Sequence, residues 1–320
     1  MDNSWYDNFL DSLYERYPHK AQLTEALMDL LAIEREAVYR RLRKDVIFHF
    51  HEAVKIAKAW NISIDAIIDV DTGYSHPFRL QTLKYIKPSK EDIEAMNASV
   101  DWLNRFVSFP DSEYMEVSNT LPPSLFLGFP QLMRYYIFKW MYQYGTESDI
   151  YPFARVIPSG EVLQTGIRYG NSFKNMADVG YIWDPLIFNY LFNDINYFTS
   201  IYLITGEDKE LLKEELLAFL DYLSDVSSKG CFPETGNRVN IYISQINIDA
   251  NYSYFYSKDI RIGRIRTFIK HEMYSTDMGM TENFKKWLNL KKRSSIQISG
   301  VDELQRIEFF IKQRQLISEL

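Results

Sequence analysis

The first seventy residues repeat apolar positions at the spacing of three and four residues that marks amphipathic helices. Pro18 interrupts the first of these runs, and Asn61 ends the fourth. A bundle of five short helices is therefore predicted. Its apolar positions are, in chain order, Trp5, Phe9, Leu10, Leu13 and Tyr17; Leu23, Leu27, Leu30 and Leu31; Val38 and Leu42; Phe50, Ala53, Val54, Ile56, Ala57 and Trp60; and the segment 63–68.

The helical pattern stops after Val70. Residues 71–88 have no helical period, and they contain Gly73, Pro77 and Pro88, which interrupt regular structure. We therefore predict a linker over this segment.

Helical spacing returns at residue 89 and dominates the rest of the chain. Three pairs of a hydroxyl residue and an aspartate three positions later predict helix starts at Ser89, Thr205 and Ser299. From Arg238 onward, alternation of period two predicts strands over 239–244, 251–257 and 260–274, with 295–299 as a further candidate. These strands are close in sequence, so we expect a small antiparallel meander.

Together these patterns predict a mainly α protein with an α+β carboxy-terminal part. A five-helix bundle over 1–70 is followed by the linker over 71–88. The larger domain over 89–320 is expected to be helical, to contain the small antiparallel sheet, and to have a sub-boundary near 230–238.

Charge distribution changes this picture, because the chain is acidic overall, with a net charge of −7. Basic residues are nevertheless concentrated between residues 35 and 44, where Glu36 is the only acid. The basic residues there are Arg35, Arg40, Arg41, Arg43 and Lys44. Screening limits distant charges to a reach of roughly 8 to 10 Å, so this local surface can attract phosphates despite the acidic total.

Residues 20–68 resemble the helix-turn-helix domain of the λ-repressor/Cro type. Leu27, Ile33 and Val38 match the helix-turn-helix core, and "IAKAWNISIDAII" is similar to the last two helices of that family. In the family the third helix lies in the DNA major groove. The resemblance implies a helix-turn-helix domain over 1–70 with its recognition helix at 34–43. This chain departs from the family where Ala32 replaces the usual glycine and Glu34 replaces the usual cap.

If Val38 and Leu42 face inward, the opposite side of the predicted recognition helix faces DNA. The expected contacts to base edges are Arg35, Glu36, Tyr39 and Arg40. The expected contacts to phosphates are Arg41, Arg43, Lys44 and, from the preceding helix, Thr24.

Other chemistry finds little support in the sequence. The single cysteine, Cys231, excludes an intramolecular disulfide, and no pattern places it beside His271 as a nucleophile and base. His49 and His51 lack a third ligand, so no metal is expected. No glycine-rich phosphate loop and no apolar run of roughly 18 to 20 residues occur. We expect no enzymatic activity, no cofactor and no membrane segment.

These expectations describe a cytoplasmic, bacterial-type transcriptional regulator that binds double-stranded DNA as a homodimer. Its layout is similar to bacterial one-component regulators, in which residues 89–320 would dimerise or sense an effector, a small molecule or a protein. The first alternative is a protein-interaction module whose amino-terminal domain keeps the helix-turn-helix shape without binding DNA, and a third possibility is an enzyme in the long domain with a regulatory amino-terminal domain. Glu34, Glu36 and the acidic total favour the interaction module.

Overall fold

The computed structural model of the chain describes residues 4–60, 62, 64, 67, 78–81, 89–146, 151–267, 271–300 and 302–320. The chain divides into two compact units, Met1–Pro77 and Phe78–Leu320. Most of the predicted linker over 71–88 lies outside the described residues. Its part at 79–81, however, forms a strand of the larger unit.

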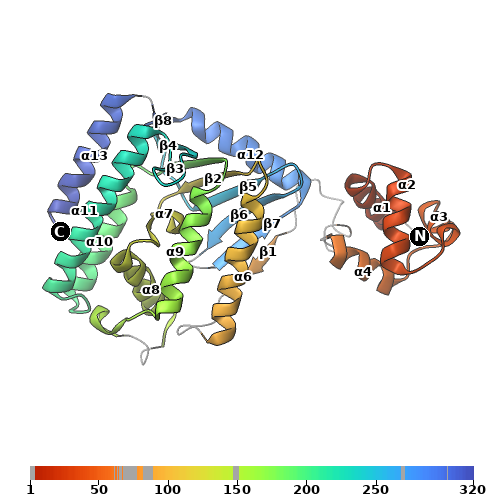
Figure 1. Cartoon of the computed structure of the whole chain (residues 1–320), viewed down its shortest axis with the longest axis horizontal. Helices are drawn as coiled ribbons and strands as arrows, with labels where there is room; N and C mark the ends of the chain where they lie inside the picture. The colour runs from red at the N-terminus through yellow and green to blue at the C-terminus, as the bar shows by residue number, and fades with distance from the viewer. Residues whose placement is uncertain are drawn as a thin grey trace. The chain divides into compact units, whose positions relative to one another are not determined.

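The smaller unit contains four helices in its described residues (Figure 1): α1 (Ser4–Arg16), α2 (Lys20–Leu31), α3 (Arg35–Leu42) and α4 (Phe50–Trp60). Most of the predicted fifth helix, at 63–68, lies outside the described residues. The core of the unit is built from the apolar positions that share one side of each helix. Its buried members are Tyr6, Phe9, Leu10, Leu13, Leu23, Leu27, Leu31, Val38, Leu42, Phe48, Ile56 and Ile67.

The larger unit alternates helices with strands. Its described helices are α6 (Lys90–Val107), α7 (Pro123–Phe126), α8 (Pro130–Tyr144), the short 3₁₀ helix η3 (Phe153–Arg155), α9 (Gly160–Lys174), α10 (Ile187–Ser200), α11 (Gly206–Lys229), α12 (Met278–Arg293) and α13 (Glu303–Ser318). Its strands are β1 (Arg79–Gln81), β2 (Glu113–Ser118), β3 (Asp178–Trp183), β4 (Arg238–Ser244), β5 (Asn251–Tyr256), β6 (Arg261–Thr267), β7 (His271–Ser275) and β8 (Ser295–Gln297).

The eight strands that the structure describes belong to one mixed sheet with the order β1-β7-β6-β5-β2-β3-β4-β8. The strands β2, β3 and β4 are parallel, with Glu113 opposite Asp178 and Asp178 opposite Arg238. All other neighbouring strands are antiparallel. The helices between β2 and β4 therefore serve as crossover connections, which parallel neighbours require.

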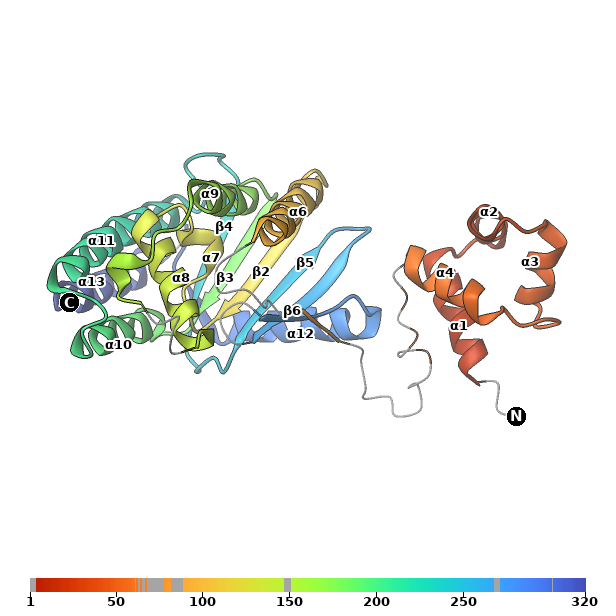
Figure 2. The same ribbon diagram turned by 90° about the horizontal axis from the view of Figure 1, so that it is seen from below.

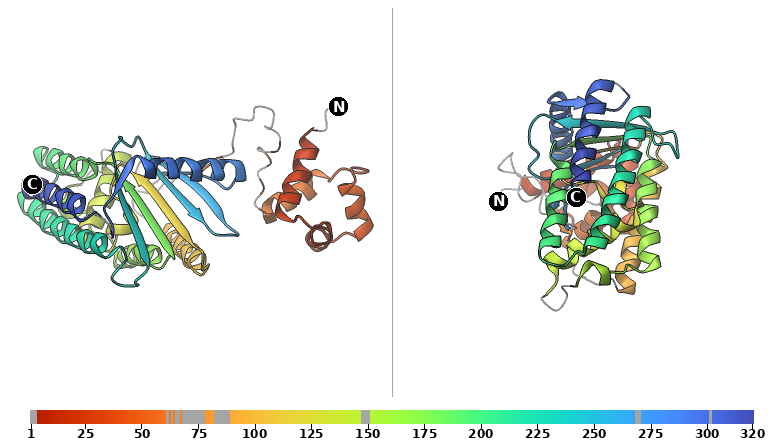
Figure 3. Two further views of the ribbon diagram at one scale, coloured as in Figure 1. Left: turned by 90° about the horizontal axis from the view of Figure 1, so that it is seen from above. Right: turned by 90° about the vertical axis from the view of Figure 1, so that its left-hand side faces the viewer.

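Helices cover both faces of this sheet. Figures 2 and 3 show α12 on one face and α6 and α9 on the other. The face under α12 carries Met115, Ile182 and Tyr254, which pack with Phe284 of α12. The opposite face carries Tyr114, Tyr181 and Phe255 and contributes to the larger core. Alternation along each strand thus divides the apolar side chains between two cores.

The predicted fold class is wrong. A five-helix bundle followed by a helical domain with a small antiparallel sheet does not describe a chain whose larger unit is organised by an eight-stranded mixed sheet. Strands β5, β6 and β7 do form an antiparallel meander, but β4 pairs with β3 and β8 instead of joining it. The strands β2 and β3 were not predicted, although they form the centre of the sheet.

The helix starts were predicted more accurately than the sheet topology. Ser89 with Asp92 and Thr205 with Asp208 each form a reciprocal capping box, as predicted. The prediction that Ser299 caps the last helix is wrong, because Asp302 is the cap and its carboxylate accepts the Gln305 N–H. In the described residues, every helix is too short or too polar to span a bilayer.

Candidate nucleic-acid interface

The turn between α2 and α3 depends on the backbone of Ala32. This residue has φ 54° and ψ 48°, and its N–H donates to the Met28 carbonyl oxygen at 2.9 Å. Glycine takes this left-handed conformation without the steric cost that a Cβ atom adds. The early reversal lets α3 begin at Arg35 and pack against α2.

Packing determines which side of α3 reaches solvent. Val38 and Leu42 are buried in the core of the smaller unit. Glu36 and Arg40 are exposed on the side opposite Val38, and Arg35 is exposed at the first residue of the helix. The half-buried Tyr39 lies beside them, and the Lys20 ammonium is 5.3 Å from the centre of its ring. Arg35, Glu36 and Arg40, three of the four residues predicted to contact bases, are thus accessible, and Tyr39 is partly accessible. Lys20 is a further cation beside them that the sequence pattern did not indicate.

Arg41 does not belong to this surface. Its Nε and Nη2 donate to the two carboxylate oxygens of Glu52 at 3.0 and 2.8 Å, and its Nη1 donates to the Ala37 carbonyl oxygen at 3.0 Å. The two paired side chains are only 11% and 7% exposed. Arg41 was predicted to contact a phosphate, but in the structure its guanidinium is bonded to Glu52 and Ala37 and links α3 to α4.

Glu52 is held ionised by its surroundings. Burial raises its pKa, but hydrogen bonds from Arg41 and from the His49 N–H, at 2.9 Å, outweigh burial, so the pKa lies below the ordinary value. A depressed folded-state pKa stabilises the fold above the pKa of the unfolded chain, and this contribution is lost as the pH falls through the folded value. The ion pair between Arg41 and Glu52 is thus fully formed at neutral pH.

Tyr6 fixes the segment that follows α3. Its hydroxyl donates to the Arg41 carbonyl oxygen at 3.1 Å and accepts the Phe48 N–H at 3.1 Å. Burial raises the pKa of Tyr6, so the hydroxyl remains a proton donor. These two hydrogen bonds connect α1 to both ends of the segment between α3 and α4.

Thr24 also lies inside the fold. Its side chain is fully buried, and its hydroxyl donates to the Lys20 carbonyl oxygen at 2.7 Å. A phosphate cannot reach a hydroxyl in this position, so the proposed contact from Thr24 is not available in this structure.

Three other cations of the segment, Arg35, Arg43 and Lys44, lie at the surface in ion pairs. Arg43 Nη2 is 2.8 Å from Glu36 and its Nε is 3.3 Å from Asp45. Lys44 Nζ is 2.5 Å from Asp7, and Arg35 Nη2 is 3.8 Å from Glu25. Exposed pairs of this kind contribute only about 0 to 1 kcal/mol, so a phosphate can compete with these carboxylates. In the described part of the chain, the exposed Arg40 has no such partner.

The structure does not bring the other candidate groups together into a reactive site. Cys231 forms a backbone bridge with Arg238, whereas the His271 ring lies against Trp140 and Tyr144. His49 and His51 stack on each other with ring centroids 6.0 Å apart. Among the described residues, no three His, Cys, Asp or Glu side chains gather as metal ligands would.

No protein-family model matches the chain, and the searches of curated proteins and of solved structures found no match. Inferences about function therefore depend on the geometry of this chain alone.

Replacing Ala32 with glycine should stabilise the smaller unit. The substitution removes the Cβ strain of the left-handed conformation, which costs roughly 1 to 2 kcal/mol. The greater conformational freedom of glycine in the unfolded chain offsets part of this stabilisation. We expect a net gain of about 0.5 to 1 kcal/mol in the opening free energy of α2 and α3, measured by hydrogen exchange of the full chain. Amide hydrogens of α2 and α3 should exchange more slowly in the variant than in the wild type, and faster exchange would contradict a strained turn.

Arg41 and Arg40, adjacent in sequence, should behave oppositely when replaced by alanine. Arg41→Ala leaves the Glu52 carboxylate buried and unpaired, so we expect a loss of about 3 to 5 kcal/mol in the stability of the smaller unit. Arg40→Ala removes only an exposed side chain and should change stability by less than about 0.5 kcal/mol. Both effects are measured by unfolding the full chain in denaturant and monitoring hydrogen exchange of the amides in α3 and α4. Similar losses from the two variants would overturn this assignment.

Proposed function

We propose that this chain is a DNA-binding transcriptional regulator of the helix-turn-helix type, acting in the cytoplasm of a bacterium. The accessible side of α3 carries the proposal, because Arg35, Tyr39 and Arg40 project from a short helix held by a tight turn. An arginine offers two parallel donors to guanine, and a good bidentate pair discriminates between bases by about 1 to 3 kcal/mol. The base-contacting residues proposed are Arg35, Glu36, Tyr39 and Arg40.

The phosphate contacts proposed are Arg43 and Lys44. Both lie at the carboxyl end of α3, exposed and paired only with surface carboxylates. Lys20 joins them as a candidate because its ammonium lies next to Tyr39. Release of counterions from DNA favours replacing each surface carboxylate by a phosphate.

The surface ion pairs also support a second candidate function, a protein-interaction module. Glu36 and Asp45 both pair with Arg43, and Asp7 pairs with Lys44, which lowers the positive charge that DNA would meet. A protein partner with mixed charges suits such a surface. The dependence of binding on salt separates the two functions.

A homodimer is the second part of the proposal. On α13, Leu304, Ile307 and Ile311 form an apolar stripe at helical spacing, with exposed fractions of 64%, 46% and 53%. Figure 1 shows α13 beside α11 at one end of the larger unit. Two copies joined through this stripe would carry two recognition helices, as binding to paired half-sites about 34 Å apart requires.

The first test uses DNA fragments that the full chain selects from genomic DNA. Arg40→Ala should weaken binding to a selected site about 5- to 100-fold while changing binding to random DNA little, because it removes a base contact. Lys44→Ala should weaken both by the same factor and reduce the slope of log affinity against log salt by about 0.9. Fluorescence anisotropy titrations give both quantities.

Lys229→Ala is the matched control, since Lys229 is an exposed lysine of α11 paired with Asp225. It should leave affinity and slope unchanged. Equal losses at both DNA types from Arg40→Ala would refute base readout, and an affinity independent of salt would favour the interaction module.

The dimer is tested by Ile307→Asp, which places a carboxylate in the apolar stripe. We expect the full chain to change from dimer to monomer at micromolar concentration, measured by light scattering after size exclusion. Leu290→Asp, which alters an exposed leucine of α12, should leave the dimer intact. A wild-type monomer, or a dimer that survives Ile307→Asp, would contradict this interface.

A further inference from the structure

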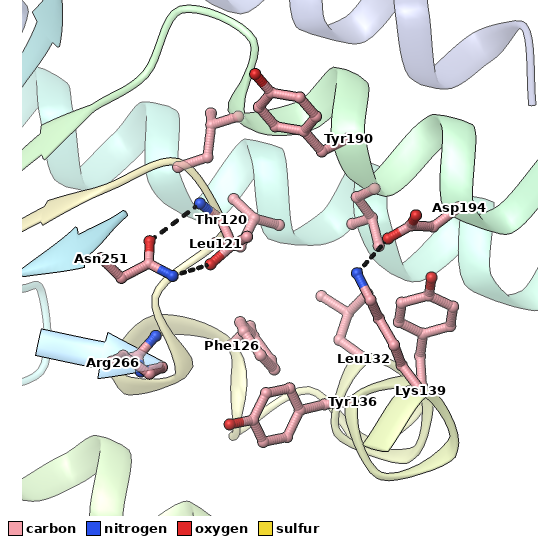
Figure 4. Close-up of a pocket in the computed structure, with 13 residues that line it drawn as sticks. Thr120, Leu121, Phe126, Leu132, Tyr136, Lys139, Tyr190, Asp194, Asn251 and Arg266 are labelled. Carbon is pink, nitrogen blue, oxygen red and sulfur yellow. Dashed lines mark hydrogen bonds and ion pairs between the residues drawn. The ribbon is translucent and has the colours of Figure 1, made fainter. Parts of the chain in front are cut away.

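The larger unit contains a cavity of about 130 Å³. Helices α8 and α10 line it together with the segment after β2 and the ends of β5 and β6. Its walls are mainly apolar, with Leu121, Phe126, Leu132 and Ile187 among them. Figure 4 shows Arg266 and Asn251 on one side and the Lys139 and Asp194 pair on the other, with Leu121 and Phe126 between them.

Arg266 brings hydrogen-bond donors to one side of the cavity. Its side chain is 13% exposed, and its Nη2 donates to Glu116 at 3.1 Å. Its Nε and Nη1 have no hydrogen-bond partner among the described residues. Glu116 is itself buried and accepts the Tyr114 hydroxyl at 2.6 Å, so this pair is locked on the sheet side. Arg266, which lines the cavity, thus has donors left for a ligand.

Asn251 does not compete for those donors. Its side-chain oxygen accepts the Asn119 N–H at 3.0 Å, and its Nδ2 donates to the Thr120 hydroxyl at 2.9 Å. Both polar atoms of this amide therefore hold the segment that forms the cavity wall.

Tyr135 supplies an unsatisfied group at the cavity. Its side chain is only 5% exposed, and its buried hydroxyl has no hydrogen-bond partner in the described structure. Burial, and secondarily the Asp194 carboxylate, raise its pKa well above the ordinary value, so the hydroxyl keeps its proton. A buried polar group without a partner costs free energy, which a ligand acceptor would recover.

The charges around the cavity are balanced. Arg266 is paired with Glu116, and Lys139 is paired with Asp194. A charged ligand would therefore add an uncompensated charge next to mainly apolar walls, which is costly. An uncharged ligand with hydrogen-bond acceptors meets the free donors without this cost.

Size limits the ligand further. A cavity of about 150 Å³ lined by apolar side chains holds a benzene-sized molecule. We propose that this cavity is a binding site for a small uncharged molecule built on a single ring, with a carbonyl or amide oxygen accepting from Arg266 or Tyr135. Binding here does not depend on whether the smaller unit binds DNA.

Benzamide and benzoate provide a matched pair of probes, because they share shape and differ in charge. Calorimetric titration of the full chain should show saturable binding of benzamide with a dissociation constant of about 1 mM, which is well within the affinity ceiling for a ligand of this size. Benzoate should bind at least about tenfold more weakly. Absence of saturable benzamide binding, or tighter binding of benzoate, would overturn the proposal.

Three variants identify the site. Leu121→Trp fills the cavity and should abolish benzamide binding. Tyr135→Phe should weaken benzamide binding about two- to tenfold if the ligand oxygen accepts from Tyr135. If the oxygen accepts from Arg266 instead, Arg266→Lys should cause the two- to tenfold loss. Tyr142→Phe removes a hydroxyl from the same helix that bonds Tyr197 instead of lining the cavity, so it should bind benzamide as the wild type does. Circular dichroism checks that each variant is folded. Unchanged binding in Leu121→Trp, or in both Tyr135→Phe and Arg266→Lys, would place benzamide elsewhere and refute this site.

Discussion

The buried ion pair between Arg41 and Glu52 is the interaction on which the proposed interface depends. It joins α3 to α4 through two charge-assisted hydrogen bonds, and Glu52 also accepts the His49 N–H. Neither partner can turn to solvent without leaving the other charge buried and unpaired. The rotation of α3 is therefore fixed with Val38 and Leu42 inward, and its opposite side, including Arg40, is presented to a partner.

A comparable pair organises the sheet of the larger unit. Glu116 on β2 and Arg266 on β6 bond across the intervening strand β5, where Ser253 stands opposite Glu116 and leaves room. Burial opposes the charge on Arg266, but the Glu116 carboxylate outweighs it and raises the pKa of the guanidinium. The pair thus holds the strands in register while Arg266 still reaches the cavity. One interaction contributes both to the fold and to the proposed binding site.

Local patterns identified many helices but not the arrangement of the sheet. The capping boxes at Ser89 and Thr205 depend on residues three positions apart, which is why they were predictable. The central strands β2 and β3 were missed because both faces are covered, so they lack the alternation of a half-exposed strand. Glu116 strengthened the error, since an acid within a short apolar run does not indicate a fully buried strand.

By itself, the sequence determined the helical segments of the smaller unit and the concentration of cations between residues 35 and 44, because both follow from neighbours along the chain. Only the tertiary structure decided the role of each cation. Arg40 and Arg41 are adjacent, yet Arg40 faces solvent whereas Arg41 bonds Glu52 on another helix. Helical period orients a side chain about its own helix axis, but its partner depends on how separate helices pack. The cavity likewise combines Tyr135 and Arg266, which lie far apart in sequence, so only folding brings them together.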